Sequence, residues 1–166
     1  MIFATVGTQL PFDRLLTALD IWAAAHPEMR IKAQTGRTDA RFAHMDCAAN
    51  LDQTSFTHAF ETARVIVAHA GMGSILSASA LGKPILLMPR RAALGEHRND
   101  HQLDTAAEMS ALPNVTVVQE GKDLAEALDR ILATPQTGDA GSSSASPQLI
   151  ANLKSFIFAT APEVTA

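Results

Sequence analysis

The sequence predicts an α/β fold: a Rossmann-like parallel sheet with helices on both faces. Three observations support this prediction. Short apolar runs alternate with segments of helical periodicity, several of these runs end at a glycine, and 47% of the 166 residues are hydrophobic. Strands separated by helices form βαβ units, whose strands pair in parallel and are covered on both faces. The predicted strands are residues 2–6, 31–34, 64–68, 85–88 and 115–118.

The first two strands flank an amphipathic helix. Residues 2–6 are apolar and partly β-branched, and they close at Gly7, as a buried strand does before a tight loop. Residues 12–22 then carry apolar side chains at helical spacing, and Pro27 ends that helix. Residues 31–34 form the second strand.

A less regular stretch follows the second strand. Residues 37–52 contain small and charged residues without a clear period, so we expect a loop with one short strand within residues 45–51. Phe56 and Phe60 then share one face of a helix. This helix leads into the third apolar run.

The second half of the chain repeats the alternation. Residues 64–68 are the clearest strand, because the run is short, continuous and β-branched. The helix after it stops at Gly82, a favourable position for a C-terminal cap, and residues 85–88 follow as a strand. We expect a polar helix over 96–112 and an amphipathic helix over 124–132.

The end of the chain differs in composition from the rest. Residues 134–147 are rich in Gly and Ser, which predicts a flexible linker. Residues 148–166 begin with an apolar stripe at helical spacing, which predicts an amphipathic C-terminal helix that packs on this domain or on a partner. Residues 1–133 then form the α/β domain.

Charge and composition exclude several classes of function. A formal net charge of -4 gives no overall attraction to nucleic acid. The single Cys47 cannot form an internal disulfide, and we expect it in the core of a protein from a reducing, cytosolic compartment. The N-terminus does not read as a signal peptide, and no apolar stretch reaches the ~18 residues of a membrane span. This length leaves no room for a cleft between two domains, so we expect another chain to supply the second wall.

The turn at residues 69–74 is the first candidate site. Gly71 and Gly73 leave backbone N–H groups accessible where a loop enters a helix, and a helix N-terminus attracts anions. A diphosphate would fit there, with Ser74 as a hydroxyl donor or as the helix cap. In the alternative interpretation the glycines only make the turn, and His69 is a polar residue at a strand end.

A polar run at residues 96–102 is the second candidate site, and three interpretations are open. In the first, His97 and His101 hold a metal ion, with Glu96 or Asp100 as a further ligand. In the second, the run contacts a polyhydroxylated substrate. In the third, it is a solvated helix start whose acidic groups suit the helix dipole. The glutamate that zinc metalloproteases place between two such histidines is missing, which disfavours the metal.

The loop at Gly7 and Thr8 is the third candidate site. Ligands bind at the carboxyl ends of strands in open parallel sheets, which places this loop on the same rim as Gly71. An ordinary strand-to-helix connection is the alternative. A dinucleotide fold is disfavoured, because no G-x-G-x-x-G follows the first strand and no acidic residue closes the second.

Six segments agree in order and spacing with those of a known family. They are residues 2–8, 12–15, 67–75 (VAHAGMGSI), 82–85, 89–90 and 99–102 (NDHQ). Together they resemble the C-terminal, nucleotide-sugar-binding domain of MurG-like glycosyltransferases of family 28, over residues 1–133. The resemblance is closest to the stand-alone form of that domain: the cytosolic subunit of the bipartite UDP-GlcNAc transferase and its bacterial counterparts of the PssE type.

The resemblance implies the donor-binding half of a GT-B enzyme and assigns its site residues. The nucleotide diphosphate is assigned to Gly7, Thr8, His69, Gly71, Met72, Gly73, Ser74 and Ser77. The donor sugar is assigned to Glu96, His97, Asn99, Asp100, His101 and Gln102. Ser77 departs from the family pattern, because many relatives carry there an acidic residue that binds the ribose hydroxyls, and serine makes a weaker contact.

The resemblance also implies a mechanism and a partner. UDP leaves against a helix N-terminus, a base on the partner chain deprotonates the acceptor hydroxyl, and no metal or other cofactor is required. The implied function is the donor-binding subunit of a bipartite inverting hexosyltransferase, which transfers a sugar from UDP to a lipid-linked acceptor in exopolysaccharide assembly. A membrane-anchored, acceptor-binding subunit would hold the chain at the inner face of the membrane.

Two other functions remain open, and the donor has one candidate feature. The chain is alternatively a non-catalytic enhancer that stabilises its membrane partner, or a metal-dependent hydrolase that uses His97 and His101. Arg90, Arg91 and Arg98 are candidates to bind a uronate carboxylate of the donor, whereas exposed arginines usually only add solubility.

Overall fold

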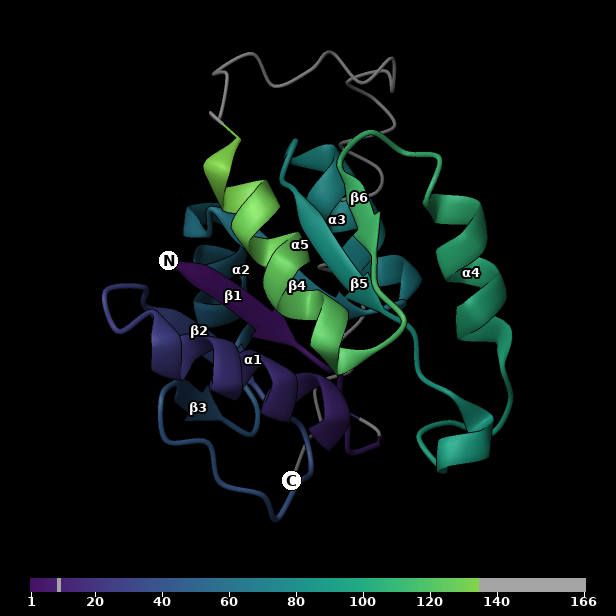
Figure 1. Cartoon of the computed structure of the whole chain (residues 1–166), viewed down its shortest axis with the longest axis horizontal. Coiled ribbons are helices and arrows are strands. Elements are labelled where there is room, and N and C mark those ends of the chain that lie inside the picture. The colour runs from purple at the N-terminus through teal and green to yellow at the C-terminus, as the bar shows by residue number, and fades with distance from the viewer. Residues whose placement is uncertain (9, 135–166) are drawn as a thin grey trace, which may run out of the picture.

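The strands form one six-stranded parallel sheet in the order β3-β2-β1-β4-β5-β6. The computed structural model describes residues 1–8 and 10–134. β1 and β4 lie at the centre of the sheet, and the strand order reverses between them (Figure 1). The predicted α/β class with a parallel sheet is confirmed. The strands are β1 (Ile2–Thr5), β2 (Ile31–Gln34), β3 (Asp46–Ala48), β4 (Val65–His69), β5 (Ile85–Met88) and β6 (Val115–Val117).

Helices cover both faces of the sheet, as expected. α1 (Asp13–Ala25) and α5 (Gly121–Ala133) lie on one face, in front of the sheet in Figure 1. α2 (Gln53–Thr62) and α3 (Met72–Ala80) lie on the opposite face. α4 (His101–Met109) stands beyond the edge that β6 forms.

Successive residues of β1 enter two separate hydrophobic cores. Ile2 and Ala4 belong to the core under α1 and α5. Phe3 belongs to the core under α2 and α3. Neighbouring side chains of a strand point to opposite faces, and both faces are covered here. This is why the strand is a continuous apolar run rather than an alternating one.

α1 and α5 pack closely on one another. The indole Nε1 of Trp22 donates to Oδ1 of Asp129 at 2.8 Å, which joins the two helices by a hydrogen bond. A Cβ on Gly121 would lie 3.0 Å from the Cβ of Ala18, so glycine lets the start of α5 approach α1. Trp22 is 3% exposed and belongs to the core of this face.

The helix expected over residues 96–112 is wrong at its start. α4 begins at His101, and a short 3-10 helix, η1 (Ala92–Leu94), precedes it. The residues between them form a loop, because Gly95 adopts a left-handed φ of 69°. The carboxylate of Asp100 accepts the backbone N–H of Ala92 at 2.8 Å and closes this loop.

Cys47 is exposed, so the expectation of a core cysteine is wrong. It lies in β3, the short strand expected within residues 45–51. β3 forms an edge of the sheet, where one side of the strand has no neighbouring strand to cover it.

Part of the predicted domain organisation lies outside the described residues. This applies to the linker from residue 135 onward and to the C-terminal helix over 148–166. None of the helices that the structure describes is both long enough and apolar enough to cross a membrane.

Candidate ligand-binding site

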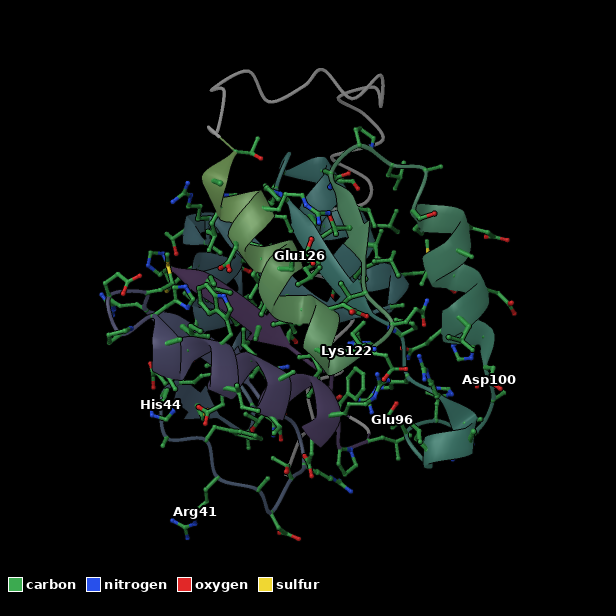
Figure 2. All side chains as sticks on the ribbon, viewed as in Figure 1. Arg41, His44, Glu96, Asp100, Lys122 and Glu126 are labelled. Atoms are coloured by element: carbon green, nitrogen blue, oxygen red, sulfur yellow. The ribbon has the colours of Figure 1, made fainter. Side chains whose placement is uncertain are left out.

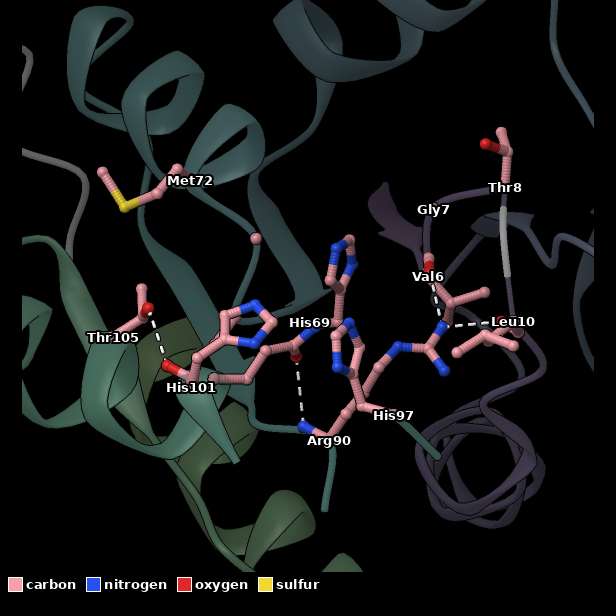
Figure 3. Close-up of a pocket in the computed structure, with 13 residues that line it drawn as sticks. Val6, Gly7, Thr8, Leu10, His69, Met72, Arg90, His97, His101 and Thr105 are labelled. Atoms are coloured by element: carbon pink, nitrogen blue, oxygen red, sulfur yellow. Dashed lines mark hydrogen bonds between the residues drawn. The ribbon is translucent and has the colours of Figure 1, made fainter. Parts of the chain in front are cut away.

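A pocket of about 360 Å³ lies at the carboxyl ends of β1 and β4, where the strand order reverses (Figure 3). Open α/β sheets bind ligands at this point, because neighbouring loops diverge there to opposite faces. The loops after β1, β4 and β5 and the start of α4 supply the walls. The lining residues are Val6, Gly7, Thr8, Leu10, His69, Ala70, Gly71, Met72, Arg90, His97, His101, Gln102 and Thr105.

The first turn of α3 presents backbone N–H groups that are free to bind a ligand. Gly71 is the N-cap residue, and no side chain caps the helix. Within the described part of the chain, the N–H groups of Met72, Gly73 and Ser74 donate to no other group. A Cβ on Gly73 would meet nothing within 4 Å, so the space above this turn is open. Such a helix start attracts an anion, through its N–H groups and through the helix dipole.

The imidazole of His69 fills the space between two glycines. A Cβ built on Gly71 would lie 2.3 Å from Nε2 of the ring, and one on Gly7 would lie 3.2 Å from Cε1. Gly7 also has a φ of 75°, which residues with a side chain rarely adopt. The ring and the loop therefore require both glycines even without a ligand.

His69 is neutral at physiological pH. Burial and the positive charge of Arg90 lower its pKa to about 4, and His97 adds to this effect while the carbonyl of Thr5 opposes it. The Nδ1 atoms of His69 and His97 are buried and have no hydrogen-bond partner among the described residues. An anion beside the ring would counter the charge of Arg90 and favour the imidazolium form of His69.

Three residues of the polar run line the pocket. His97 and His101 meet edge to face, with ring centroids 4.5 Å apart. Gln102 is buried, and its Oε1 accepts the backbone N–H of Arg90 at 3.1 Å. Asn99 lies outside the lining, and its Oδ1 contacts Nδ1 of His101.

Glu96 and Asp100 hold the loop between η1 and α4 and do not line the pocket. The carboxylate of Glu96 accepts Nε and Nη2 of Arg14 at 2.7 and 2.8 Å. It also accepts the backbone N–H of Arg91 at 2.9 Å. Figure 2 shows Glu96 inside the outline of the molecule and Asp100 at its outer edge. The carboxylate of Glu96 is thus bound by α1 and by the backbone before the loop, and that of Asp100 by the backbone N–H of Ala92.

If His97 and His101 held a metal ion, neither Glu96 nor Asp100 would be available as a further ligand. Across the residues that the structure describes, no group of three His, Cys, Asp or Glu side chains could hold a metal ion. His97 and His101 are neighbours, whereas Glu96 is bound to Arg14. This geometry counts against a hydrolase that uses the two histidines with an adjacent acid.

Of the predicted site residues in α3, one lines the pocket and three do not. Met72 lines the pocket and is 45% exposed. Ser74 and Ser77 lie outside the lining, and Ser77 is buried in the second turn of the helix. Gly73 also lies outside the lining, next to the open space above the first turn.

Arg90 is not available to a substrate carboxylate, which corrects the expectation for this arginine. Its side chain is almost completely buried. Its Nη2 donates to the carbonyls of Val6 and Leu10, both at 2.7 Å. Its Nη1 donates to the carbonyls of Pro11 and Glu96. No local sequence signal shows this arrangement, because three of the four acceptors come from the loop after β1.

Sequence reasoning also missed Leu10 and Thr105 in the lining. Thr105 follows His101 by one helical turn on α4, and its hydroxyl donates to the carbonyl of His101 at 2.9 Å. Helical spacing from a correctly placed start would have found Thr105. Leu10 follows no pattern that distinguishes it from a core residue.

The charge of the pocket suits an anionic ligand. Its described lining residues include three histidines and one arginine, and none of them is acidic. The unpaired N–H groups of α3 point to the same ligand class. Figure 3 shows His69 and His97 between His101 and the guanidinium of Arg90. Phosphate groups are the ligands that this combination binds best.

The sequence matches one family model. The model of the glycosyltransferase family 28 C-terminal domain matches residues 1–156. No curated protein sequence shows a significant match.

Solved structures share the fold at low sequence identity. A glycosyltransferase of kitacinnamycin has a TM-score of 0.61 and 20% identity, over 95% of this chain and 39% of that one. MurG of Acinetobacter baumannii has a TM-score of 0.52 and 16% identity, over 96% and 45%. The C-terminal CMP-Kdo binding domain of WaaA from the same organism has a TM-score of 0.51 and 12% identity, over 93% and 87%. The chain thus spans less than half the length of the first two, and its fold is that of the C-terminal half of a GT-B glycosyltransferase.

Proposed function

Because the chain belongs to the family of the glycosyltransferase family 28 C-terminal domain, we propose that it binds the nucleotide-sugar donor of a glycosyltransferase. The donor is a UDP-sugar. The pocket at the carboxyl ends of β1 and β4 holds its diphosphate, and the residues of the loop after β5 and of α4 face its sugar.

One observation carries this proposal. The N–H groups in the first turn of α3, unpaired among the described residues, open onto free space beside a pocket in whose described lining no residue is acidic. A diphosphate needs several donors and positive charge in one place, and it needs no metal ion where the protein supplies both.

The residues have distinct roles in this proposal. Met72, Gly73 and Ser74 offer backbone N–H groups to the diphosphate, and His69 lies beside it. His97 and Gln102 reach the donor sugar from the opposite wall. Ser77 is buried, so a neutral contact to the ribose would require another residue of the rim.

The proposed reaction is an inverting transfer. The bond between the anomeric carbon and the diphosphate oxygen breaks, and its electron pair stays on the departing UDP. The acceptor hydroxyl attacks the anomeric carbon from the opposite side and gives its proton to a base on the acceptor side. The N–H groups and dipole of α3 stabilise the charge that develops on UDP.

The acceptor side belongs to a second component in this proposal. It is a membrane-anchored subunit that binds a lipid-linked glycan, and it holds the chain at the inner face of the membrane. The support is the residue-by-residue resemblance to stand-alone subunits of this type. A non-catalytic enhancer of the same membrane subunit is the competing function.

Ligand titration tests the proposal directly. We expect the purified chain to bind UDP by calorimetry, equally with and without EDTA, and to bind CMP more weakly. Gly73→Val fills the open space above the helix start and should weaken UDP binding at least about 10-fold without loss of stability, because valine is no worse than glycine in a helix. Ala125→Val, on the exposed face of α5, is the matched control and should bind as the wild type does. No UDP binding at millimolar concentration would refute the proposal, and tighter CMP binding would refute a UDP donor.

A transfer assay separates the two functions. Membranes from the source cell are mixed with a radiolabelled UDP-sugar and with the wild-type chain or Gly73→Val. If the chain is the donor-binding subunit, Gly73→Val should stimulate transfer far less than the wild type does. Equal stimulation by both chains would instead identify a non-catalytic enhancer.

A further inference from the structure

Arg90 is a buried charge whose hydrogen-bond acceptors are all uncharged. Its side chain is 3% exposed. Its four Nη protons are used by four carbonyls, and its guanidinium lies over the ring of Phe12, 4.6 Å from the centroid. A buried charge is costly unless a counter-charge or a full set of hydrogen bonds compensates it. Here both Nη atoms are hydrogen-bonded, and among the residues that the structure describes no carboxylate forms an ion pair with the guanidinium.

The carboxylate whose charge acts on Arg90 is already paired with another arginine. Glu96 accepts two bonds from the guanidinium of Arg14, with side-chain exposures of 11% and 19%. Burial lowers the pKa of Arg90 and the charge of Glu96 raises it, and an arginine remains protonated under both influences. Arg14, Glu96 and Arg90 together therefore leave one positive charge without a partner. That charge lies in the lining of the pocket.

Arg90 also joins three walls of the pocket. Its side chain binds both ends of the loop after β1, through Val6 and Leu10. It binds the loop after β5 through the carbonyl of Glu96, the residue before His97. Its backbone N–H binds Gln102 of α4. One residue thus fixes the spacing between these walls.

We propose that Arg90 is a positioning residue of the donor site: it ties the walls of the pocket together and supplies, through space, the positive charge that compensates the diphosphate. This inference rests on the proposed function. The ligand does not need to touch Arg90, because all four Nη protons are already bound. His69 lies between this charge and the first turn of α3, so its pKa responds to the charge and to an anion bound at that turn. In the part of the chain that the structure describes, the titratable and charged groups that act on His69 are Arg90 and His97.

The first test measures the pKa of His69 by NMR in two variants. Arg90→Met removes the charge and should raise the pKa of His69 above its wild-type value of about 4, while burial continues to hold it below the ordinary value. Arg90→Lys keeps the charge and should leave this pKa nearly unchanged. Arg91→Met is the matched control, because that side chain pairs with Glu120 and Gln119 and not with the pocket loops. A purely structural role would leave the pKa of His69 the same in folded Arg90→Met, and that result would overturn the proposal.

The second test measures affinity for UDP and for inorganic pyrophosphate. We expect Arg90→Met to weaken both at least about 10-fold, Arg90→Lys to recover most of the loss, and Arg91→Met to bind as the wild type does. Equal affinities of the wild type and Arg90→Met would overturn the proposal. If the wild type binds neither probe, the proposed function fails, whereas the effect of Arg90 on His69 is still measured by the first test.

A third measurement needs no variant and decides the matter if Arg90→Met does not fold. Saturating pyrophosphate should raise the pKa of His69 in the wild-type chain, because the bound anion compensates the charge of Arg90. Calorimetry at pH 5 in two buffers of different ionisation enthalpy should then show proton uptake on binding, because pH 5 lies just above the pKa of free His69. Binding without any change in the pKa of His69 would mean that the anion does not lie beside this charge, and would overturn the proposal.

Discussion

The ring of His69 determines what its neighbours can be. It lies against Gly7 and Gly71, and the nearby charge of Arg90 keeps it neutral. The steric and electrostatic constraints act on the same ring. They can be measured separately, because one changes with the size of a neighbour and the other with pH.

The electrostatic constraint predicts how stability depends on pH. The pKa of His69 is about 4 in the folded chain and near 6.5 when unfolded, so between these values only the unfolded chain binds this proton. The free energy of unfolding therefore falls as the pH falls from 6.5 to 4, by up to about 3 kcal/mol from this group. The measurement is urea unfolding at pH 4, 5, 6 and 7 for the wild type and His69→Gln. The free energy of unfolding of the wild type minus that of His69→Gln should fall as the pH is lowered. A value that is constant over this range would contradict the prediction.

The steric constraint predicts a double-mutant cycle. Gly71→Ala should cost about 1–3 kcal/mol of stability in the wild type, because its Cβ would overlap Nε2 of His69. The backbone φ of Gly71 is -96°, which alanine accepts, so the ring is the obstacle. In a His69→Ala background the same change should cost less than about 1 kcal/mol, the usual loss at an N-cap position. Additive costs in thermal or urea unfolding would show that the ring is not the obstacle.

The sequence predicted which residue types lie at the rim of the pocket. It showed only part of why each position requires its residue type. Gly71 was expected because a helix start with accessible N–H groups binds an anion. The structure adds a contact with a ring that Gly7 also touches, and no sequence pattern connects these two glycines. Arg90 shows the same limit more strongly, because its side chain binds carbonyls that lie about 80 residues earlier in the chain.

Among the secondary-structure elements, the loop between η1 and α4 decides which polar residues reach the pocket. Its sequence of charged and amide residues resembles the first turn of a helix, and it was expected to be one. Hydrogen bonds to Glu96 and Asp100 hold it instead as a loop, which leaves His97 facing the pocket. Propensity could not show this, because the partner of Glu96 lies on α1.

The role of Glu96 can be tested by one substitution. If Glu96 holds the loop, Glu96→Gln should lower the free energy of unfolding by about 1–3 kcal/mol, because the partly buried guanidinium of Arg14 loses its charged partner. Asp100→Asn is the control, since it changes one exposed hydrogen bond and should cost at most about 1 kcal/mol. If Glu96 instead contacts the donor sugar, Glu96→Gln would keep its stability and lose affinity for the UDP-sugar alone. Urea unfolding and calorimetry on the same variants distinguish the two roles.

At the scale of the whole molecule, the order of the strands places the site. Alternating strands and helices predicted a parallel sheet covered on both faces, and the rule for open sheets predicted the rim on which Gly7 and Gly71 lie. The order 3-2-1-4-5-6 then brings β1 and β4 together, so loops that are about 60 residues apart form one pocket. The pairing of strands was beyond the sequence pattern, because both central strands are apolar on both faces and either could pair with any other.

The same sheet also carries the effect of a ligand to the far side of the molecule. Trp22 is the only tryptophan, and it lies in the core under α1 and α5, away from the pocket lining. β1 contributes residues to both cores, so we expect the described domain to unfold in one cooperative transition. UDP at about 100 times its dissociation constant should then stabilise the fold by about 2.7 kcal/mol and raise the Trp22 fluorescence midpoint by about 5–10 °C. Far-UV circular dichroism should give the same midpoint as Trp22 fluorescence, both without UDP and with it. Two separate transitions, or a Trp22 midpoint that does not move while UDP binds, would mean that the two faces of the sheet unfold independently.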